Sequence, residues 1–318
     1  MNRRQFSRSL GITTVALAAG QFKLTSGGST LVMKPVPQVA LTMDDFNWNN
    51  SIKLNPEQRN EAILATLNRY SIKAGIFVIG RNIESERGKA LLADWDKAGH
   101  LIANHTYSHR NYNAPEMTSK EYYQDIVRAE ELLKQFPQFK KSFRFPFLKE
   151  GDTAAKRDEL RASLAGHGYD MGYVTIDNSD WAIDNRLRTR LEKNPDANLQ
   201  PYRYFYLEHM WARAQYYDSL AHKVAGRPVR HTILTHFNLL NALFLGDVME
   251  MFKAKGWRWI DATDAFNDPV FKARPKTVPA GESILWALAK ESGKIDKNLR
   301  YPAEDGEYEN ARMNKLGL

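Results

Sequence analysis

Short apolar runs alternate along most of this chain with longer segments in which apolar residues recur at helical spacing. Seven of the runs are predicted to be strands: Val39–Thr42, Ile76–Ile79, His100–Ala103, Ser142–Phe145, Met171–Ile176, His231–Leu234 and Trp257–Ile260. Strands that alternate with helices predict an α/β fold in which helices cover a mainly parallel sheet. An open sheet and a closed barrel both satisfy this pattern.

Two of the predicted helices have recognisable starts. Asn55 stands as a cap before a first-turn proline, Pro56. Thr118 is followed three residues later by Glu121, which is the spacing of a capping box. Apolar residues then follow on one helical face: Ala62, Ile63 and Leu67 after the first start, and Tyr122, Ile126, Leu133 and Phe136 after the second. Both segments are therefore predicted to pack one face against the sheet.

Two segments interrupt the alternation. Residues 185–230 form a long insertion with aromatic residues beside arginines, a combination that can bind sugar rings or nucleic acid but is more typical of helix positions facing a core. Residues 267–318 form a C-terminal extension with one predicted helix, Gly281 to Lys290, and then a polar end. We therefore predict a main domain over 38–266. The aromatic residues of the insertion are Tyr202, Tyr204, Phe205, Tyr206, Trp211, Tyr216 and Tyr217.

The N-terminus has the pattern of an export signal. Arg3 and Arg4 precede the mildly apolar run Leu10–Gly20, and this order resembles a twin-arginine signal. Ala16-Leu17-Ala18 is a candidate cleavage site, and the run is far shorter than the roughly 20 residues of a membrane span. We therefore expect residues 1–20 to be the signal and 21–37 a spacer. The protein is expected to use the twin-arginine machinery and to be periplasmic, cell-surface or secreted.

Composition and charge exclude several classes of function. The chain has no cysteine, so disulfides, thiolate metal sites and cysteine nucleophiles are excluded, and any metal must bind His, Asp or Glu. The formal charge of +8 falls by three to +5 once Arg3, Arg4 and Arg8 are removed with the signal. The remaining basic residues alternate with acids along predicted helices, as on a solvated face, so we predict no nucleic-acid partner.

Candidate chemistry stands at the C-terminal ends of predicted strands, where parallel α/β folds build their sites. Asp44 and Asp45 follow the first strand. Neighbouring side chains on an extended chain point in opposite directions, so one carboxylate could bind a metal while the other faces substrate or water. Alone, such a pair is more typical of a solvated turn.

A pair of histidines follows the third predicted strand. His105 and His109 are four residues apart and would share one face of a helical turn, so their rings could converge on a cation. Together with Asp45 they would supply three ligands and leave positions open for water, as in a catalytic site. Such ligands suit zinc best, and cobalt, nickel or manganese also fit.

With these residues in place, the sequence resembles carbohydrate esterase family four, the polysaccharide deacetylases with a NodB homology domain. Five segments match the family motifs in order: Thr42-Met43-Asp44-Asp45, His105 to His109, Arg144-Phe145-Pro146-Phe147, Asp177-Asn178-Ser179-Asp180-Trp181 and Leu234-Thr235-His236. The resemblance implies a distorted (β/α)7 barrel with a C-terminal extension.

The resemblance also implies a role for each motif residue. Asp44 would be the base, His236 the acid, and Asp45, His105 and His109 the metal ligands. Arg144 would pair with Asp44, and Asp180 would orient His236. The substrate groove would contain Pro146 and Phe147, whose backbone amide would help to bind the oxyanion, and Trp181 and Leu234, which would face the acetyl methyl group.

Two positions depart from the family pattern. Met43 replaces the usual Phe, and on the strand face opposite Asp44 it is expected to pack in the core. Phe147 replaces the usual Tyr, so it retains the backbone amide but lacks the hydroxyl group. The substitution at Phe147 bears on substrate preference more than on reaction type. The histidines outside the motifs are predicted to be structural or solvent-exposed: His100, His167, His209, His222 and His231.

The function expected from the resemblance is metal-dependent N-deacetylation of chitin-like chains, poly-N-acetylglucosamine or peptidoglycan. O-deacetylation of acetylated xylan is the main alternative, because the same attack by water serves esters. A cytoplasmic amidase of the same superfamily conflicts with the export signal. A carbohydrate-binding protein with a decayed site is a further alternative, but the full set of motif residues argues against it.

Overall fold

The computed structural model describes residues 35–293 and 306–318. The predicted export signal and most of the predicted spacer lie outside the described residues. No helix in the two described ranges combines the length and the apolar character that a membrane span requires.

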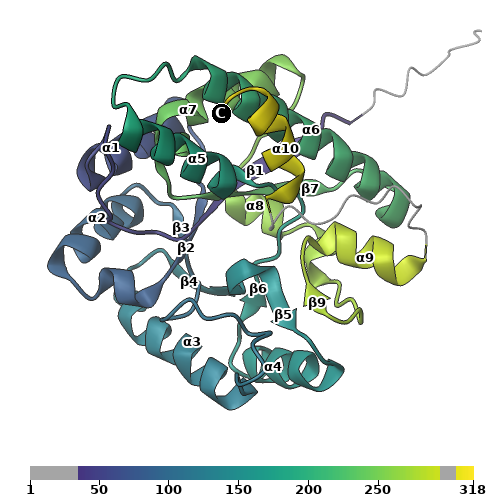
Figure 1. Ribbon diagram of the computed structural model, residues 1–318. Coiled ribbons are helices and arrows are strands. Elements are labelled where there is room, and N and C mark those ends of the chain that lie inside the picture. Colours follow the sequence, from purple (N-terminus) through teal and green to yellow (C-terminus); the bar gives the residue numbers. More distant parts are fainter. Residues whose placement is uncertain (1–34, 294–305) are drawn as a thin grey trace, which may run out of the picture. The chain divides into compact units, whose positions relative to one another are not determined.

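Seven parallel strands form the central sheet, in the order β6-β4-β3-β2-β1-β7, with β8 paired to the start of β1 (Figure 1). Ile176 donates to the carbonyl of Thr232 and accepts from Leu234, so the chain after β6 pairs with β7 and closes the sheet into a distorted barrel. The predicted fold class is therefore confirmed. The strands are β1 Gln38–Asp44, β2 Gly75–Val78, β3 Leu101–Asn104, β4 Phe139–Phe143, β6 Asp170–Met171, β7 Arg230–His236 and β8 Arg258–Trp259.

One predicted strand is largely wrong. Of the run from Met171 to Ile176, only the first residue lies in a strand, and Ile176 makes an isolated bridge. Side-chain hydrogen bonds here interrupt a regular ladder beside the few backbone ones: the hydroxyl of Thr175 donates to the carbonyl of Thr232 and accepts from its N–H. Threonine hydroxyls compete with the regular ladder in this way, and the apolar pattern does not reveal it.

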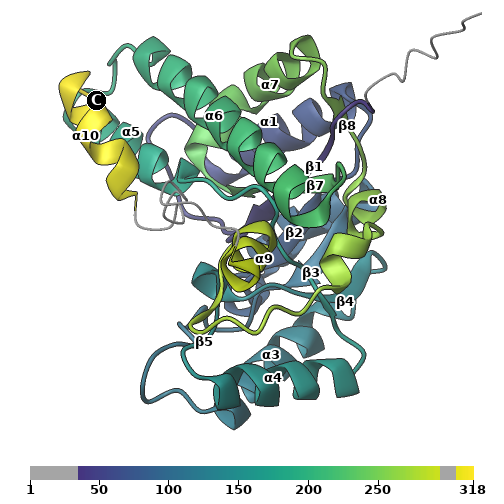
Figure 2. The same cartoon turned by 90° about the vertical axis from the view of Figure 1, so that its right-hand side faces the viewer.

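Helices cover the outside of the barrel, and both predicted starts are confirmed. Asn55 caps the first helix in a capping box with Gln58, and Thr118 forms its predicted box with Glu121. Around the barrel, α1 packs against α7, and α6 packs against both α7 and α9 (Figure 2). The helices are α1 Pro56–Arg69, α2 Glu86–Lys97, α3 Ser119–Leu133, α4 Ala154–Gly166, α5 Asp180–Lys193, α6 Gln200–Ala225, α7 Leu239–Ala254, α8 Ala262–Phe266, α9 Ile284–Ser292 and α10 Glu307–Lys315.

The aromatic residues of the insertion mostly face the core. The insertion contains most of α5 and the long helix α6. Tyr202, Phe205, Tyr206 and Tyr217 are buried, whereas Tyr204 is 60% exposed. Their spacing along α6 places the buried rings against the barrel and its neighbouring helices, so the core-facing interpretation holds for these four residues.

The C-terminal extension returns to the barrel. Its short strand β9, Ala280–Gly281, pairs antiparallel with β5, Lys149–Gly151. The predicted helix over 281–290 begins later, as α9 at Ile284, because Gly281 belongs to β9. Helix α10 was not predicted, since its sequence is strongly polar and offers no apolar stripe. Its attachment instead depends on buried Glu309 and Met313.

Candidate active site

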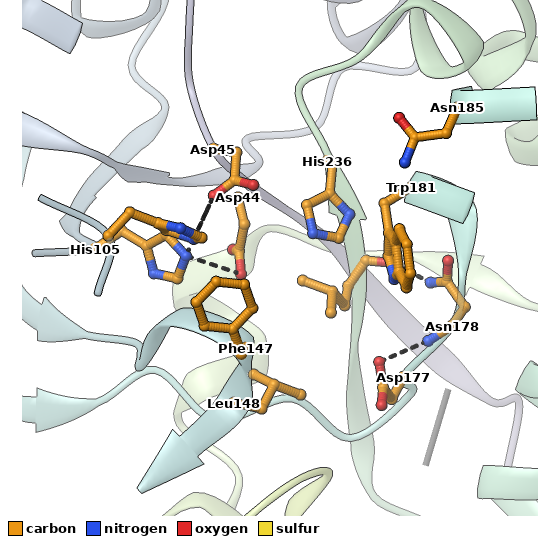
Figure 3. A pocket seen from close by; sticks show the side chains of 12 residues that line it. Asp44, Asp45, His105, Phe147, Leu148, Asp177, Asn178, Trp181, Asn185 and His236 are labelled. Atoms are coloured by element: carbon orange, nitrogen blue, oxygen red, sulfur yellow. Dashed lines mark hydrogen bonds and ion pairs between the residues drawn. The ribbon is translucent and has the colours of Figure 1, made fainter. Parts of the chain in front are cut away.

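A pocket of about 360 Å³ opens where the C-terminal ends of β1, β3 and β7 meet the start of α5 (Figure 3). In this view the side chains of Asp45 and His105 lie on one side of the pocket and those of His236 and Trp181 on the other. Motif residues far apart in the sequence are thus brought together. The lining residues are Asp44, Asp45, His105, His109, Phe147, Leu148, Asp177, Asn178, Trp181, Asn185, Leu234 and His236.

Backbone geometry at the end of β1 differs from the extended chain that we expected. Asp44 is the last residue of the strand and is buried, but Asp45 has a positive φ of 60°. This left-handed turn cancels the alternation of a strand, so both carboxylates line the same pocket. Met43 is fully buried in the core, as expected.

The two histidines also reach the pocket without a helical turn, so that part of the prediction is wrong. His105 follows β3, and the loop after it has positive φ at Thr106 and His109. Asp125 of α3 holds this loop, because its carboxylate accepts from the N–H and the hydroxyl of Ser108. The loop brings the two imidazole rings to a centroid distance of 5.1 Å.

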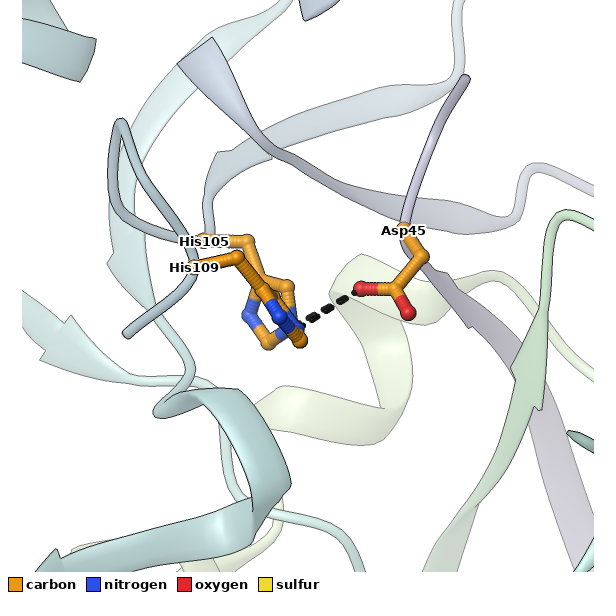
Figure 4. Close-up of side chains that lie close together, drawn as sticks. All are labelled: Asp45, His105 and His109. Carbon is orange, nitrogen blue, oxygen red and sulfur yellow. Dashed lines mark ion pairs between the residues drawn. The ribbon is translucent and has the colours of Figure 1, made fainter. Parts of the chain in front are cut away.

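Asp45, His105 and His109 form a group that could hold a metal ion (Figure 4). The Asp45 Oδ1 atom lies 3.0 Å from His109 Nε2 and 3.5 Å from His105 Nε2. Among the described residues, no contact to this buried oxygen has the geometry of a hydrogen bond. A buried carboxylate oxygen without a donor is costly unless a cation binds it.

The tautomer of His105 supports the same conclusion. Its Nδ1 lies 2.8 Å from the carbonyl oxygen of Arg144, which can only accept, so Nδ1 must carry the proton. In the neutral ring Nε2 then presents a lone pair toward Asp45. A carbonyl that accepts from the ring nitrogen facing away from the metal, and so fixes the tautomer, is typical of metal-binding histidines. The donor set therefore fits a divalent cation.

The electrostatics around Asp45 keep it ionised. Burial acts to raise the pKa of Asp45, but the imidazoles of His105 and His109 lower it well below its ordinary value. An ionised carboxylate beside two imidazole nitrogens is the state that a metal site requires.

Arg144 holds the neighbouring carboxylate, Asp44. Its Nη1 donates to Asp44 Oδ1 at 2.6 Å, its Nε donates to the carbonyl of Gly172, and its Nη2 donates to the hydroxyl of Thr42. Arg144 and Asp44 are 2% and 3% exposed, so this ion pair is desolvated and its geometry is fixed. The remaining oxygen, Asp44 Oδ2, lies 3.7 Å from His105 Nε2.

His236 stands on the other side of the pocket and is held by Asp180. Its Nδ1 lies 2.6 Å from Asp180 Oδ1, and its backbone N–H donates to Asp180 Oδ2. Burial acts to lower the pKa of His236, but the charge and hydrogen bond of Asp180, with smaller contributions from Asp45 and Asp44, raise it to about 10. The imidazole is therefore charged at neutral pH and can donate a proton from Nε2.

The third motif ends in a tight turn rather than a strand. Phe147 has φ 58° and ψ 13°, and Leu148 also has a positive φ of 54°. The Phe147 ring is 49% exposed and lies 4.7 Å from the ring of His109. Trp181 and Leu234 line the pocket as predicted, whereas Pro146 is buried beneath the turn and is not among the lining residues.

Several residues of the site were missed in the sequence. Leu148 and Asn185 line the pocket, and Asp177 and Asn178 line it without a role having been predicted for them. Asn238 and Asn241 complete the set of donors to Asp180, at 3.1 and 2.7 Å. Asn238 could have been found as the cap of the helix that follows His236, but Asn241 carries no comparable signal.

The five other histidines are structural or exposed, as predicted. His100 and His231 are buried and hydrogen-bonded, His167 ends α4, and the side chain of His222 is 52% exposed. His209 lies nearer the site than expected, because its Nε2 accepts from the N–H of Ser179, next to Asp180.

Comparison with known proteins finds a family model that matches part of the chain. Residues 32–171 match the family model of polysaccharide deacetylases. This match contains the first three motifs, through Arg144 and Phe147. Over 106 residues the chain is 31% identical to the peptidoglycan-N-acetylglucosamine deacetylase of Bacillus cereus, an alignment that covers 33% of this chain and 34% of that protein. The chain thus spans about a third of the length of this relative. The family resemblance is confirmed over this part of the chain.

Solved structures extend the comparison at the level of the fold. A mutant of a CE4 family pseudoenzyme is 18% identical, with a TM-score of 0.50 and coverage of 73% of this chain and 68% of that chain. The peptidoglycan deacetylase PdaC from Bacillus subtilis is 20% identical, with a TM-score of 0.47 and coverage of 72% and 90%. Because the fold occurs in a protein described as a pseudoenzyme, it does not decide activity by itself. The residues of the pocket must do so.

Proposed function

We propose that this chain, of which residues 32–171 match the polysaccharide deacetylase family model, is a metal-dependent hydrolase that removes N-acetyl groups from an N-acetylglucosamine-containing polysaccharide and releases acetate. One observation carries the proposal. A single pocket holds a three-residue cation group, a carboxylate anchored by Arg144, and a charged His236 anchored by Asp180. A decayed site would be expected to lack part of this set.

Each residue has one task in the proposed reaction. A divalent cation at Asp45, His105 and His109 would lower the pKa of a water molecule and polarise the acetyl carbonyl. Asp44 accepts the proton of the attacking water through the oxygen that Arg144 leaves available. The backbone amide of Phe147, which lines the pocket, would help to bind the developing oxyanion. His236 donates its proton to the departing amine, which is a poor leaving group unless it is protonated.

The substrate follows from the walls of the pocket. Trp181 and Leu234 provide apolar surface for an acetyl methyl group, and the exposed ring of Phe147 offers a face on which a sugar ring can stack. We propose peptidoglycan, chitin-like chains or poly-N-acetylglucosamine as substrates. The named activity of the Bacillus cereus relative supports peptidoglycan among these.

A substrate panel tests the function. Purified protein is incubated with chitin oligomers, poly-N-acetylglucosamine, peptidoglycan and acetylated xylan, and released acetate is measured. We expect release from at least one N-acetylated glycan. Release from xylan alone would replace the proposal with O-deacetylation. No release from any polymer by metal-loaded protein would refute deacetylation.

The metal is proposed to be zinc, because two histidines and one carboxylate with open positions match catalytic zinc sites, although cobalt, nickel or manganese also suits these ligands. Elemental analysis of the purified protein should find roughly one divalent ion per chain. Activity that persists in protein shown to be free of metal would exclude the proposed reaction.

Export is a separate proposal that depends on the sequence alone. Arg3 and Arg4 before a short apolar run support transport by the twin-arginine machinery to the periplasm or the cell surface. That route carries folded proteins, so the metal could be bound before transport. Changing both arginines to lysine in a reporter fusion should retain the reporter in the cytoplasm. Unchanged export of the doubly substituted fusion would show that the signal is of another kind.

A further inference from the structure

A segment of the C-terminal extension lies directly behind the turn that carries Phe147. Residues 280–284, here called the strap, contain β9 and the first residue of α9. Strand β9 pairs with β5, which begins immediately after the turn, with Gly281 opposite Lys149. The strap is thus joined to the pocket although more than a hundred residues of chain separate it from the turn.

The turn needs external support. Phe147 and Leu148 both have positive φ, a conformation that side-chain-bearing residues adopt singly and seldom in succession. Such backbone persists only where surrounding contacts determine it. Local hydrogen bonds from Leu148 to Phe145 and from Lys149 to Pro146 close the turn. They do not attach it to the barrel.

The strap makes this attachment on one side. The N–H of Glu282 donates to the carbonyl of Leu148 at 2.9 Å, and the Glu282 carboxylate lies 2.8 Å from Lys149 Nζ. Gly281 has φ 121°, and a Cβ built on it would lie 1.8 Å from the carbonyl oxygen of Leu148. Only glycine lets the strap approach the turn this closely.

On its other side the strap is fixed to the barrel. The hydroxyl of Ser283 donates to the carbonyl of Thr175 at 2.8 Å, and the N–H of Ile284 donates to the carbonyl of Val174 at 2.9 Å. Ser283 and Ile284 are fully buried or nearly so. Val174 packs in a small apolar cluster with Leu148 and Leu234, and the last two line the pocket. The strap therefore connects the turn to the segment beside β7.

We propose that the strap is a positioning element of the active site, which holds the Phe147–Leu148 turn beside the pocket that both residues line. Gly281, Glu282 and Ser283 are positioning residues in this sense, since none of the three is among the residues that line the pocket. The predicted effect of the strap on catalysis rests on the proposed deacetylase function. Its predicted effect on the position of the turn does not depend on that function.

Two substitutions and a matched control test the strap. Gly281→Ala forces a methyl group against the carbonyl of Leu148, and Ser283→Ala removes the anchor at Thr175 with little change in volume. Gly256→Ala is the control, because Gly256 also has a positive φ, of 81°, but a Cβ there meets nothing within 4 Å. All three are compared with wild type as full-length, metal-loaded protein.

Hydrogen exchange is measured by mass spectrometry, and acetate release is measured under steady-state conditions. We expect faster exchange in peptides covering 145–151 in both strap variants, with unchanged exchange in 230–236. Gly281→Ala should lower kcat roughly 10- to 100-fold, because a displaced oxyanion donor forfeits part of its stabilisation. Ser283→Ala should lower it less, and both should retain KM and metal content.

The outcomes separate this inference from the proposed function. Unchanged exchange at 145–151 in Gly281→Ala, or faster exchange with kcat equal to that of wild type, would overturn the positioning role. If Gly281→Ala does not fold, Ser283→Ala decides by the same two criteria. If wild-type protein releases no acetate from any glycan, the deacetylase proposal fails, and the exchange result still decides whether the strap holds the turn.

Discussion

The two sides of the pocket reach their geometry by different means. On the metal side, Asp45, His105 and His109 are carried by loops with positive φ, and the Asp45 Oδ1 atom has no hydrogen-bond donor among the described residues. On the acid side, Asp180 is fully buried at the start of α5 and accepts from the backbone N–H and Nδ1 of His236 and from two asparagines.

This difference indicates what each side requires. The metal side brings a carboxylate oxygen and two imidazole nitrogens together without a hydrogen bond to that oxygen, an arrangement that a bound cation would stabilise. The acid side needs no cation, because the protein itself supplies the hydrogen-bond donors that compensate for the burial of the Asp180 carboxylate. We therefore expect loss of metal to disturb the loops at His105 and His109 while the pair of His236 and Asp180 stays in place.

The largest effect is expected on the metal side, from Asp45→Asn. A neutral amide is a weaker ligand than a carboxylate, so this variant should lose metal and activity together and recover in part with excess cation. Metal content is measured by elemental analysis beside acetate release. Full metal occupancy with normal activity in Asp45→Asn would remove Asp45 from the ligand set.

Asp44→Asn, at the next position, is the matched comparison. It removes the proposed base and leaves all three ligands, so activity should fall about 10²- to 10⁴-fold with metal content intact. The same two measurements apply. If Asp44→Asn loses the metal while Asp45→Asn keeps it, the roles of the two residues are reversed.

On the acid side, His236→Ala should lower amide hydrolysis about 10²- to 10⁴-fold and retain metal. Activated acetate esters should be affected far less, because a phenolate departs without a proton. The ratio of amide to ester rates in wild type and variant measures this directly. Equal losses on both substrates would argue that His236 is not the acid.

The smallest expected effect is a shift in pH dependence caused by Asp180→Asn. The carboxylate raises the pKa of His236 to about 10, so the alkaline limb of kcat should move to lower pH when that charge is removed.

The raised pKa of His236 also has a consequence for folding. The stability contributed by the charged pair is fully present below pH 6.5 and is lost as pH rises through about 10.

Thermal unfolding of metal-free protein provides the readout for this pair. The difference in Tm between wild type and Asp180→Asn should be largest below pH 6.5 and should shrink as His236 loses its proton. Asn241→Ala is a milder control, because it removes one donor to Asp180 and one to the carbonyl of His236 but leaves the contact between Asp180 and the His236 ring. A Tm difference that does not change with pH would show that Asp180 stabilises the fold without charging His236.

Much of the fold was predictable because it depends on local patterns. Six of the seven predicted strands occur within a few residues of their expected places, and both helix starts have the expected caps. The strand at 171–176 failed because hydrogen bonds of the Thr175 and Thr232 hydroxyls leave only an isolated backbone bridge there, which only the partner strand reveals. Helix α10 was missed because its polar sequence is held by Glu309, which contacts buried Arg213.

By itself the sequence determined which residue types stand at the ends of which strands, since periodicity and motif spacing are properties of neighbouring residues. The tertiary structure decided how those residues face one another. The left-handed turns at Asp45 and Phe147, the two asparagines behind Asp180, and the contact of Gly281 with Leu148 all depend on backbone brought together across the barrel. Sequence periodicity does not reveal such contacts, because their favourable and unfavourable free energies arise between residues that are distant in sequence.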